Sequence, residues 1–475
     1  MSLSSDKETD AFVAAQRFGM GPSGSRGNNG SMKTIVSDPR GWLEAQIKNP
    51  PVFTSGLTSG LTSGLANQAQ LESSTSIIKQ VSGKRGDSEA AKKAIRSLAK
   101  KHYLNESVAR LHQAVISEQP FFERLVLFWS NHFTVSANKK NVIRPIVGAY
   151  EREAIRPHVL GTFPEMLRAA VQHPAMLLYL DNASSIGPNS KAGKRRGKGL
   201  NENLAREIME LHTLGVNGGY TQDDVISLAK IITGWTLNPP RQGGGGYRFI
   251  DRLHEPGSHQ LLGKTYGQRG EAQGLAALND LALHPSTAKF IATKLARHFI
   301  TDEPDKEDIR TLSKTYLASD GDLKAMYSTL ITMEAPWRSP LSKVKSPYEL
   351  MISSARLMTV QSGTSASSKF PFDDRAYRRL IKTLATFEQM PFSAPSPAGW
   401  SDRAADWISP KATLNRIEWC HAFAQALRPQ VNPLELAREV IGAVSGPETL
   451  LWIERAPSPV EGLALLLASP EWQRR

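Results

Sequence analysis

The sequence predicts an all-α or nearly all-α globular fold with flexible inserted loops and at most a small β ribbon. Apolar residues recur at the spacing of one helix face along most of the chain, as at Ile95 and Leu98 within residues 88–118. Proline and glycine stand at the ends of these segments, because proline lacks the backbone donor that a helix interior requires. Runs with the two-residue period of a strand are almost missing, and YRFI at 247–250 is the kind of short piece that could form a ribbon.

Local signals set the ends of the expected helices. Asp10 is the expected N-cap of the first helix. The residue before a proline avoids the α conformation, so His173–Pro174 should interrupt its segment. Thr221 and Asp224 resemble a capping box, with Asp in place of the usual Glu. The expected helices lie at 10–21, 38–47, 88–118, 142–156, 162–180, 201–214, 221–234, 285–299, 307–317, 346–359, 374–388, 411–427, 433–443 and 459–468, with a further apolar segment after Pro120.

One low-complexity segment divides the chain. The tetrapeptide TSGL occurs three times in a row at 54–65, and this period is too short for a solenoid repeat. Tandem glycine, serine and threonine are typical of a flexible linker. The expected units are an N-terminal helical segment at 1–53, a linker at 54–87 and a main helical body at 88–475. The main body and residues 10–53 are expected to form one continuous domain. Inserted loops are expected at 187–199 and 239–246.

Composition excludes several classes of protein. Hydrophobic residues make up 40% and charged residues 22% of the 475, which is typical of a folded globular chain, and no run of about 20 apolar residues occurs. The single cysteine, Cys420, excludes an internal disulfide and a cysteine-built zinc site, and we expect a buried, inert thiol. The N-terminal MSLSSDKETDAF has no apolar run, so we expect no secretory signal and a cytoplasmic location, with export alongside a partner as the alternative.

The chain is basic, with a formal net charge of +13 that would attract polyanions. It carries no zinc-finger, RNA-recognition or bZIP pattern, so nucleic acid is not the expected main partner. Within the loop at 187–199, the segment GKRRGKG at 193–199 precedes a helix N-terminus, where backbone amides favour an anion. The alternative is a solvated, disordered loop. The candidate anion-binding residues are Lys194, Arg195, Arg196 and Lys198.

Several segments together resemble one family. They are RFGMGP near the start, FWSNHFTVS at 128–136, HPAMLLYLDN at 173–182, NENLAREIMELHTLGVNGGYTQDDV at 201–225, ITGWTL at 232–237, HEPGSHQLLG at 254–263, HPSTAKFIATKLARHFI at 284–300 and LLLASPEWQRR at 465–475. In this order they resemble the bacterial domain-of-unknown-function 1800 family, from about residue 10 to residue 475.

The resemblance implies no established activity. It implies a gene context beside an exported protein of the domain-of-unknown-function 1501 family, which is similar to sulfatases or phosphatases. That protein is the partner that the resemblance indicates. Many members of the family carry an export signal, and this sequence departs from them.

A helix at 201–214 is the clearest candidate site. At about 100° per residue, such a helix separates its polar and apolar side chains onto opposite faces. The polar face carries Glu202, Asn203, Arg206, Glu207 and Glu210, and the opposite face carries Leu204, Ile208, Leu211 and His212. The polar residues either form surface ion pairs at four-residue spacing or line a cleft, where they bind a cation or act as acid and base.

Histidines are the other candidates. His132, in WSNHF, follows an apolar segment, where a lone histidine is typically a core or capping residue. His254 and His259 stand five apart in a Pro/Gly-rich loop. No HExxH or Glu-x-x-His spacing occurs, so a metal site would need residues from distant helices. The candidate catalytic residues are His132, Asn203, Glu207, Glu210 and His212, and the candidate metal ligands are His132, Glu207, Glu210 and His254, with His173 and Asp181 as further residues to locate.

Two main hypotheses about function remain open, and no cofactor can be named. The first is a binding or assembly protein that works with the neighbouring sulfatase- or phosphatase-like protein. The second is an enzyme, of metal-dependent or other type, with a Glu/Asn/His cleft around 201–214. The enzyme hypothesis requires the polar groups to converge within about 4–6 Å, and the assembly hypothesis requires them to disperse and an apolar patch to be exposed. Polyanion binding by 191–198 is a third option.

Overall fold

Helices make up most of the chain, as the sequence predicts. The computed structural model describes residues 2–24, 30–49, 71–83, 88–196, 199–239, 244–360, 373–429 and 431–475. The strands within them form two separate two-stranded sheets. None of the helices in these ranges is both long enough and apolar enough to cross a membrane.

The first half of the chain contains short helices around two longer ones, α5 and α6. Within the described residues, a stretch of π-helix directly follows α1, α7 and α11, at Ala14–Phe18, Glu151–Ile155 and Ile208–His212. The helices are α1 (Ser2–Val13), α2 (Met32–Ser37), α3 (Pro39–Lys48), α4 (Ser74–Gly83), α5 (Glu89–Ile116), α6 (Pro120–His132), α7 (Val147–Tyr150), α8 (Phe163–Gln172), α9 (Pro174–Tyr179), α10 (Gly193–Arg196), α11 (Asn203–Glu207) and α12 (Gln222–Ile231).

The two sheets follow α12, and helices occupy the rest. Strand β1 (Trp235–Leu237) pairs antiparallel with β2 (Tyr247–Phe249), and β3 (His259–Leu261) pairs antiparallel with β4 (Lys264–Tyr266). The ribbon expected at 247–250 is therefore present. The remaining helices are α13 (Glu271–Ala282), α14 (Pro285–Phe299), α15 (Lys306–Ala318), α16 (Leu323–Thr332), α17 (Ala335–Arg338), α18 (Pro347–Leu357), α19 (Asp374–Thr386), α20 (Pro410–Leu427), α21 (Pro433–Ile441), α22 (Pro447–Glu454) and α23 (Pro459–Ala468).

Side-chain caps explain where many helices begin. The capping box expected at Thr221 and Asp224 is present, with each side chain bonded to the other residue's backbone N–H. The break expected at His173–Pro174 is also present, and there His173 Nδ1 accepts a hydrogen bond from the Ala175 N–H at 3.1 Å. Proline fits the first turn of a helix because no backbone donor is needed there.

Three local expectations need correction or lie outside the described residues. Asp10 is not an N-cap, because α1 begins eight residues earlier at Ser2. Part of the expected linker at 54–87 is helix α4, whose Ile77 and Ile78 are buried. The TSGL repeat at 54–65 lies outside the described residues.

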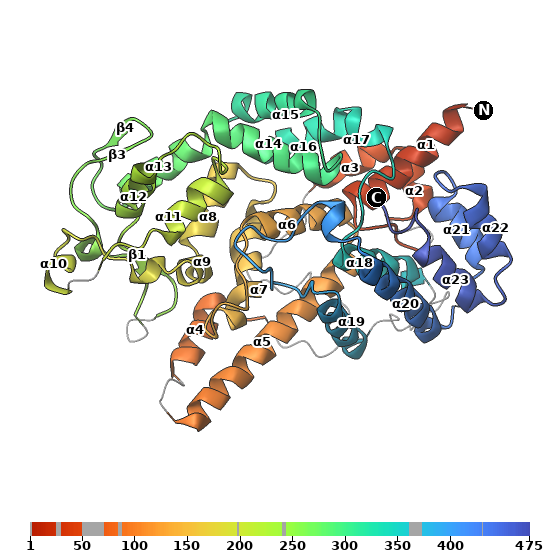
Figure 1. Cartoon of the computed structure of the whole chain (residues 1–475), viewed down its shortest axis with the longest axis horizontal. Helices are drawn as coiled ribbons and strands as arrows, with labels where there is room; N and C mark the ends of the chain where they lie inside the picture. The colour runs from red at the N-terminus through yellow and green to blue at the C-terminus, as the bar shows by residue number, and fades with distance from the viewer. Residues whose placement is uncertain are drawn as a thin grey trace.

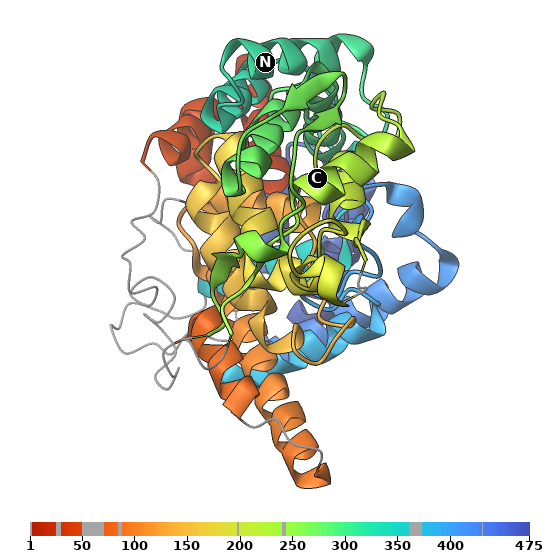
Figure 2. The same cartoon turned by 90° about the vertical axis from the view of Figure 1, so that its left-hand side faces the viewer.

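Buried apolar side chains from Ala11 to Trp472 form one continuous core. In Figure 1, the first and last helices, α1–α3 and α20–α23, lie at one end of an elongated molecule, and β1–β4 with α10–α13 lie at the other. Helix α5 projects from the body, as Figures 1 and 2 both show. Cys420 is buried as expected, and burial raises the pKa of its thiol to about 12.

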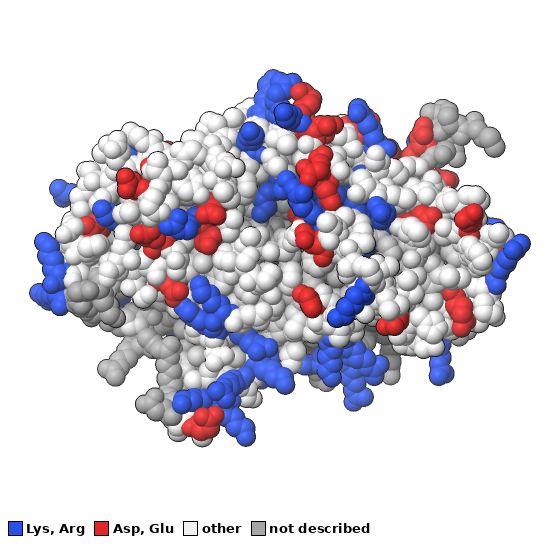
Figure 3. Space-filling view, viewed as in Figure 1, with Lys and Arg blue, Asp and Glu red and all other residues white. Residues whose placement is uncertain are grey.

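Exposed basic side chains gather on one side of the molecule, over α5 and α19 (Figure 3). On the surface of these helices, Arg96 pairs with Glu89 at 3.5 Å and Arg378 pairs with Asp374 at 2.6 Å. The exposed basic residues of the two helices are Lys92, Lys93, Arg96, Lys100, Lys101, Arg375, Arg379 and Lys382.

Candidate functional site

The helix that the sequence singled out is split between two environments. Residues 203–207 are α-helical and residues 208–212 are π-helical, so the helix changes its winding halfway. Asn203 is exposed, and Glu207 and Glu210 are half-buried, whereas His212 is fully buried. The polar face and the histidine therefore face in different directions, as the two-sided pattern predicts.

The acidic face forms ordinary surface interactions. Glu202 and Arg206 make the expected ion pair at 3.2 Å, and Gln222 donates a hydrogen bond to Glu202 at 2.8 Å. Partial burial, followed by the charge of Glu210, raises the pKa of Glu207. The charge of Glu210 thus affects Glu207, but His132 and His212 lie on the buried side of the helix.

The two histidines meet inside the aromatic core. His132 Nε2 donates a hydrogen bond to the His212 carbonyl oxygen at 3.0 Å, and the two ring centroids are 6.2 Å apart. Phe133 packs edge-on against His132 and also contacts His212. Burial lowers the pKa of both rings, that of His212 to about 3, so both are neutral at pH 7.

The four candidate metal ligands are not brought together. His254 Nδ1 lies 3.0 Å from the Thr233 carbonyl oxygen, and its ring packs against Phe249. Within the described part of the chain, no group of three or more His, Cys, Asp or Glu is placed to hold a metal ion. His132 and His254 instead make the kind of backbone contacts that structural histidines make.

The remaining candidates make local contacts or fall partly outside the described residues. His173 Nε2 lies 3.0 Å from Glu153, and Asp181 pairs with Lys140 and lies 3.8 Å from Lys139. In the basic loop, Lys194 and Arg195 are exposed on the one-turn helix α10. The side chain of Arg196 and the whole of Lys198 lie outside the described residues.

The basic loop is anchored at its start. Asn189 donates two hydrogen bonds to the buried carboxylate of Glu255, from its backbone N–H at 2.8 Å and its Nδ2 at 2.6 Å. The Gly187 N–H donates to the Leu253 carbonyl oxygen at 2.9 Å. These contacts fix residues 187–189, ahead of the basic residues of the loop.

A pocket of about 110 Å³ lies elsewhere, between α5, α6, α14, α18 and the segment 389–407. Sequence reasoning did not identify it as a site. Its wall combines aromatic rings with charged side chains that come from distant parts of the chain. The residues used below are Arg110, Arg124, Ser130, Asn131, Glu151, His298, Tyr348, Glu349, Phe392, Trp400, Asp402 and Arg475.

A histidine and an aspartate form a dyad in this wall. His298 Nδ1 lies 2.7 Å from Asp402 Oδ1, and 8% of the His298 surface is exposed. Burial alone would raise the pKa of Asp402, but the interaction with His298 outweighs burial and lowers this pKa to about 2. For His298, burial lowers the pKa of the ring. At pH 7 a neutral ring therefore donates its Nδ1–H to an ionised carboxylate.

The other ring nitrogen of His298 is bare. His298 Nε2 is buried and has no hydrogen-bond partner among the described residues. When Nδ1 carries the proton, Nε2 presents a lone pair. A buried lone pair without a partner is costly, so it is expected to accept a hydrogen bond from a bound molecule or a water.

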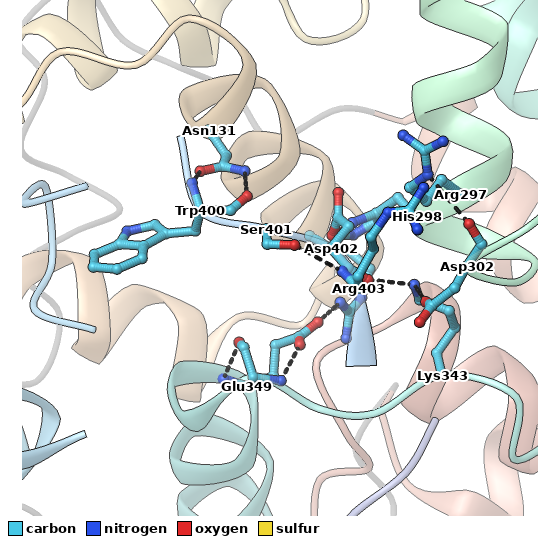
Figure 4. Close-up of polar contacts among 12 residues, drawn as sticks. Asn131, Arg297, His298, Asp302, Lys343, Glu349, Trp400, Ser401, Asp402 and Arg403 are labelled. Carbon is cyan, nitrogen blue, oxygen red and sulfur yellow. Dashed lines mark hydrogen bonds and ion pairs between the residues drawn. The ribbon is translucent and has the colours of Figure 1, made fainter. Parts of the chain in front are cut away.

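Three elements hold the aspartate segment in place (Figure 4). Asn131 of α6 clamps Trp400 with two hydrogen bonds, of 2.8 Å to its carbonyl oxygen and 2.7 Å from its N–H. Lys343 Nζ donates to the Asp402 carbonyl oxygen at 2.5 Å and pairs with Asp302. Asp302 also accepts a hydrogen bond from the Ala404 N–H at 2.7 Å.

A glycine permits the clamp. Gly399 has φ +84°, and a Cβ there would lie 2.5 Å from the Asn131 carbonyl oxygen. The chain can therefore approach α6 closely at this position, which delivers the Asp402 carboxylate to His298.

A buried carboxylate joins two arginines on one side of the pocket. Glu349, the N3 residue of α18, accepts a hydrogen bond from the Ser346 N–H at 2.7 Å, pairs with Arg124 and lies 3.0 Å from Arg475 Nε. Although burial opposes it, Arg475 and Arg124 hold the pKa of Glu349 far below its usual range. Arg124 further donates to the Gly19 carbonyl oxygen at 2.6 Å, which ties α6 to the N-terminal segment.

A second ion pair lies on another part of the wall. Arg110 Nη2 lies 2.9 Å from Glu151 Oε2, and Ser130 donates to the same carboxylate at 2.7 Å. The Arg110 guanidinium lies over the rings of Tyr348 at 5.4 Å and Phe392 at 4.5 Å. These contacts fix the guanidinium plane within the wall.

Comparison with known proteins assigns the chain to a family. A family model described as a protein of unknown function (DUF1800) matches residues 13–474. The chain belongs to this family. No curated protein and no solved structure matches the chain. Three of the segments on which the DUF1800 resemblance rests, at 128–136, 284–300 and 465–475, contribute residues to the pocket wall.

Some signals for the pocket were present in the DUF1800 segments. His298 stands next to apolar residues in ARHFI, and Arg475 belongs to the segment EWQRR. Their sequence positions do not indicate that they meet. Asp402 has no helical pattern around it, so its role could be seen only once the fold placed it beside α14.

Proposed function

We propose that this DUF1800 protein is an enzyme in which His298 acts as a general base on a water or hydroxyl bound in the pocket. The observation that carries the proposal is the His298–Asp402 hydrogen bond, together with the unpartnered Nε2 in the pocket wall. A histidine oriented by a carboxylate, with its second nitrogen available to a reacting group, is an established arrangement for proton transfer.

Each part of the dyad has a definite task in this proposal. Asp402 fixes the tautomer and stabilises the imidazolium that forms when Nε2 takes a proton. The clamps from Asn131 and Lys343 keep Asp402 in register with His298. The lowered pKa of His298 keeps the resting ring neutral, which a base requires.

The attacking oxygen is expected to come from the bound molecule or a water. The hydroxyl of Ser130 is bonded to Glu151 at 2.7 Å, and that of Ser346 accepts the Glu349 N–H at 3.3 Å. The third serine of the wall, Ser401, accepts a hydrogen bond from the Arg403 N–H at 3.1 Å. All three pocket serines thus have structural partners, and none is paired with His298. This favours activation of water, as in hydrolysis, over a covalent serine mechanism.

Turnover of a panel of p-nitrophenyl substrates, namely an acetate, a phosphate, a sulfate and a glucoside, tests the proposal. We expect at least one to be hydrolysed, with a loss of about 10²-fold or more in His298→Gln and a smaller loss in Asp402→Asn. His421→Gln, on an exposed position of α20, is the control.

The outcomes separate the two candidate sites. Turnover that survives His298→Gln would exclude the proposed base. If Glu207→Gln instead abolishes turnover, the acidic face at 202–210 is the active site that the sequence first indicated.

Assembly with a partner protein is the second candidate function. Among the described residues, most of the large apolar side chains that stay exposed belong to the C-terminal part of the chain, with Trp452 at 65%. Exposed apolar side chains on neighbouring helices favour docking. The residues are Ile408, Leu414, Ile417, Leu451, Trp452 and Leu465.

Co-expression with a DUF1501-family protein from the same genome tests this second function, since the family resemblance indicates that partner. Joint purification that Trp452→Ser weakens, and Leu317→Ser does not, would support it. Leu317 is exposed at 43% on α15 and serves as the matched apolar control. If neither substitution changes the joint purification, the C-terminal surface is excluded as the docking site.

A further inference from the structure

The pocket wall contains buried hydrogen-bond donors that have no partner. Tyr348 Oη is buried without a hydrogen-bond partner among the described residues, and so is Arg110 Nε. Tyr348 is 5% exposed, so bulk solvent does not satisfy its hydroxyl. An unsatisfied buried donor costs about 1–3 kcal/mol, which makes its retention informative.

The Tyr348 hydroxyl stays protonated at neutral pH. Burial is the main cause that raises the pKa of Tyr348 well above its usual range. The Arg110 guanidinium lies over the Tyr348 ring, so the two donors belong to the same part of the wall. Tyr348, Arg110 and His298 all line the pocket, and each has one buried polar atom without a partner among the described residues: two are donors and one, His298 Nε2, is an acceptor.

The surrounding charge favours a ligand that brings negative charge. Burial, followed by the nearby charge of Arg475, lowers the pKa of Arg124, Lys343 and Arg17. Arg17 is fully buried and forms no ion pair with an Asp or Glu among the described residues, and its guanidinium donates to Ser342 Oγ at 2.8 Å. The pocket wall itself balances three arginines against three carboxylates, namely Arg110, Arg124 and Arg475 against Glu151, Glu349 and Asp402. The additional positive charge of Arg17, next to Arg475, favours a ligand that brings negative charge.

We propose that the pocket binds a small oxyanion, a phosphate, sulfate or carboxylate group, whose oxygens accept hydrogen bonds from Tyr348 Oη and Arg110 Nε. This inference names the substrate class of the site described above and rests on the proposed function. The hydroxyl or water that His298 activates lies beside the oxyanion. A pocket of about 110 Å³ suits a compact group of this kind.

Binding of three inorganic probes tests the proposal without knowledge of the substrate. Isothermal calorimetry is run with sodium phosphate, sodium sulfate and sodium acetate, and with sodium chloride at matched ionic strength as the reference. We expect at least one oxyanion to bind more than tenfold more tightly than chloride. The strongest of the three identifies the charge and shape of the group. Equal binding of all four salts would overturn the proposal.

Tyr348→Phe provides the sharper test, because it removes only the unpartnered hydroxyl. The ligand-free variant should be as resistant to urea as the parent or more so, whereas its oxyanion affinity should fall about tenfold or more. Tyr316→Phe is the matched control: its hydroxyl donates to the Ala282 carbonyl oxygen at 2.8 Å, outside the pocket. We expect it to lose stability and keep its affinity. An unchanged affinity in Tyr348→Phe overturns the proposal.

The proposal and the proposed function fail in different ways. His298→Gln should bind the oxyanion with little change yet lack turnover. Turnover of a neutral ester that depends on His298, without oxyanion binding, would leave the base in place and refute the ligand class. Oxyanion binding together with turnover that does not depend on His298 would refute the proposed base and leave the ligand class in place.

Discussion

Glu349→Gln is the substitution that most directly tests the charge network around the pocket. Glutamine has nearly the size of glutamate and can still accept the Ser346 N–H, so the start of α18 should keep its cap. What is removed is the negative charge that faces Arg124 and Arg475. Both arginines are at most 2% exposed, so water cannot replace the lost partner.

The expected loss is about 3–5 kcal/mol of unfolding free energy, the range for removing one partner of a buried ion pair. Loss of a cap alone would cost only about 1 kcal/mol, so the size of the effect distinguishes the two causes. A typical protein is stable by about 5–15 kcal/mol, and the variant should therefore unfold at a clearly lower urea concentration.

Urea unfolding at pH 7, followed by circular dichroism, measures the effect. In the double variant Glu349→Gln with Arg124→Gln, the loss should be smaller than the sum of the single losses, since each removes the same pair. Glu307→Gln, in an exposed pair with Arg310, is the control and should not change the urea midpoint. A loss below about 1 kcal/mol in Glu349→Gln would refute the assigned role of the network.

Three further predictions concern other parts of the molecule. Gly399→Ala should lower turnover and stability together, because its Cβ collides with the Asn131 backbone, and urea unfolding with the ester assay checks both. The pKa of His212 is about 3 in the folded chain against 6.5 for a free ring, so the unfolded chain binds the proton first and stability falls as pH drops from about 6.5 toward 3. His212→Leu should therefore reduce the loss of stability between pH 7 and pH 4, and an unchanged pH slope would contradict the burial of a neutral ring. Lys93→Glu, on the exposed side of α5, should leave both the urea midpoint and oxyanion binding unchanged, and calorimetry that shows weaker binding would place the anion site on the basic surface instead.

The parts of the fold that could be predicted from the sequence are those that local rules decide. The capping box at Thr221 and the break at His173–Pro174 depend on residues within four positions of one another. Helix α4 escaped prediction because its stability comes from distant contacts. Ser74 donates two hydrogen bonds to Glu153, and Ile77 is buried in the core.

The pocket could not be predicted for the same reason. His298 and Asp402 are 104 positions apart, and Arg124 and Glu349 are 225 apart. Helical periodicity indicates which side of a helix is buried, and it correctly placed Glu207 and His212 on opposite sides of their helix. It does not indicate which buried side chains from different helices meet. The candidate catalytic and metal roles of the 201–214 helix stay predictions, to be tested by the substitutions above.

The spread of the pocket residues along the chain has a consequence for biosynthesis. The wall needs α5 and α6 at residues 89–132, α14 at 285–299 and Arg475, which follows α14 by more than 170 residues. During translation, the nascent chain could fold its early helices long before the last contributor leaves the ribosome. The Arg17 contact with the Arg475 carbonyl oxygen would then form among the last, and until it does the chain has no complete pocket. Ligand-binding capacity would thus be acquired in a single late step, so an incomplete translation product would be inert.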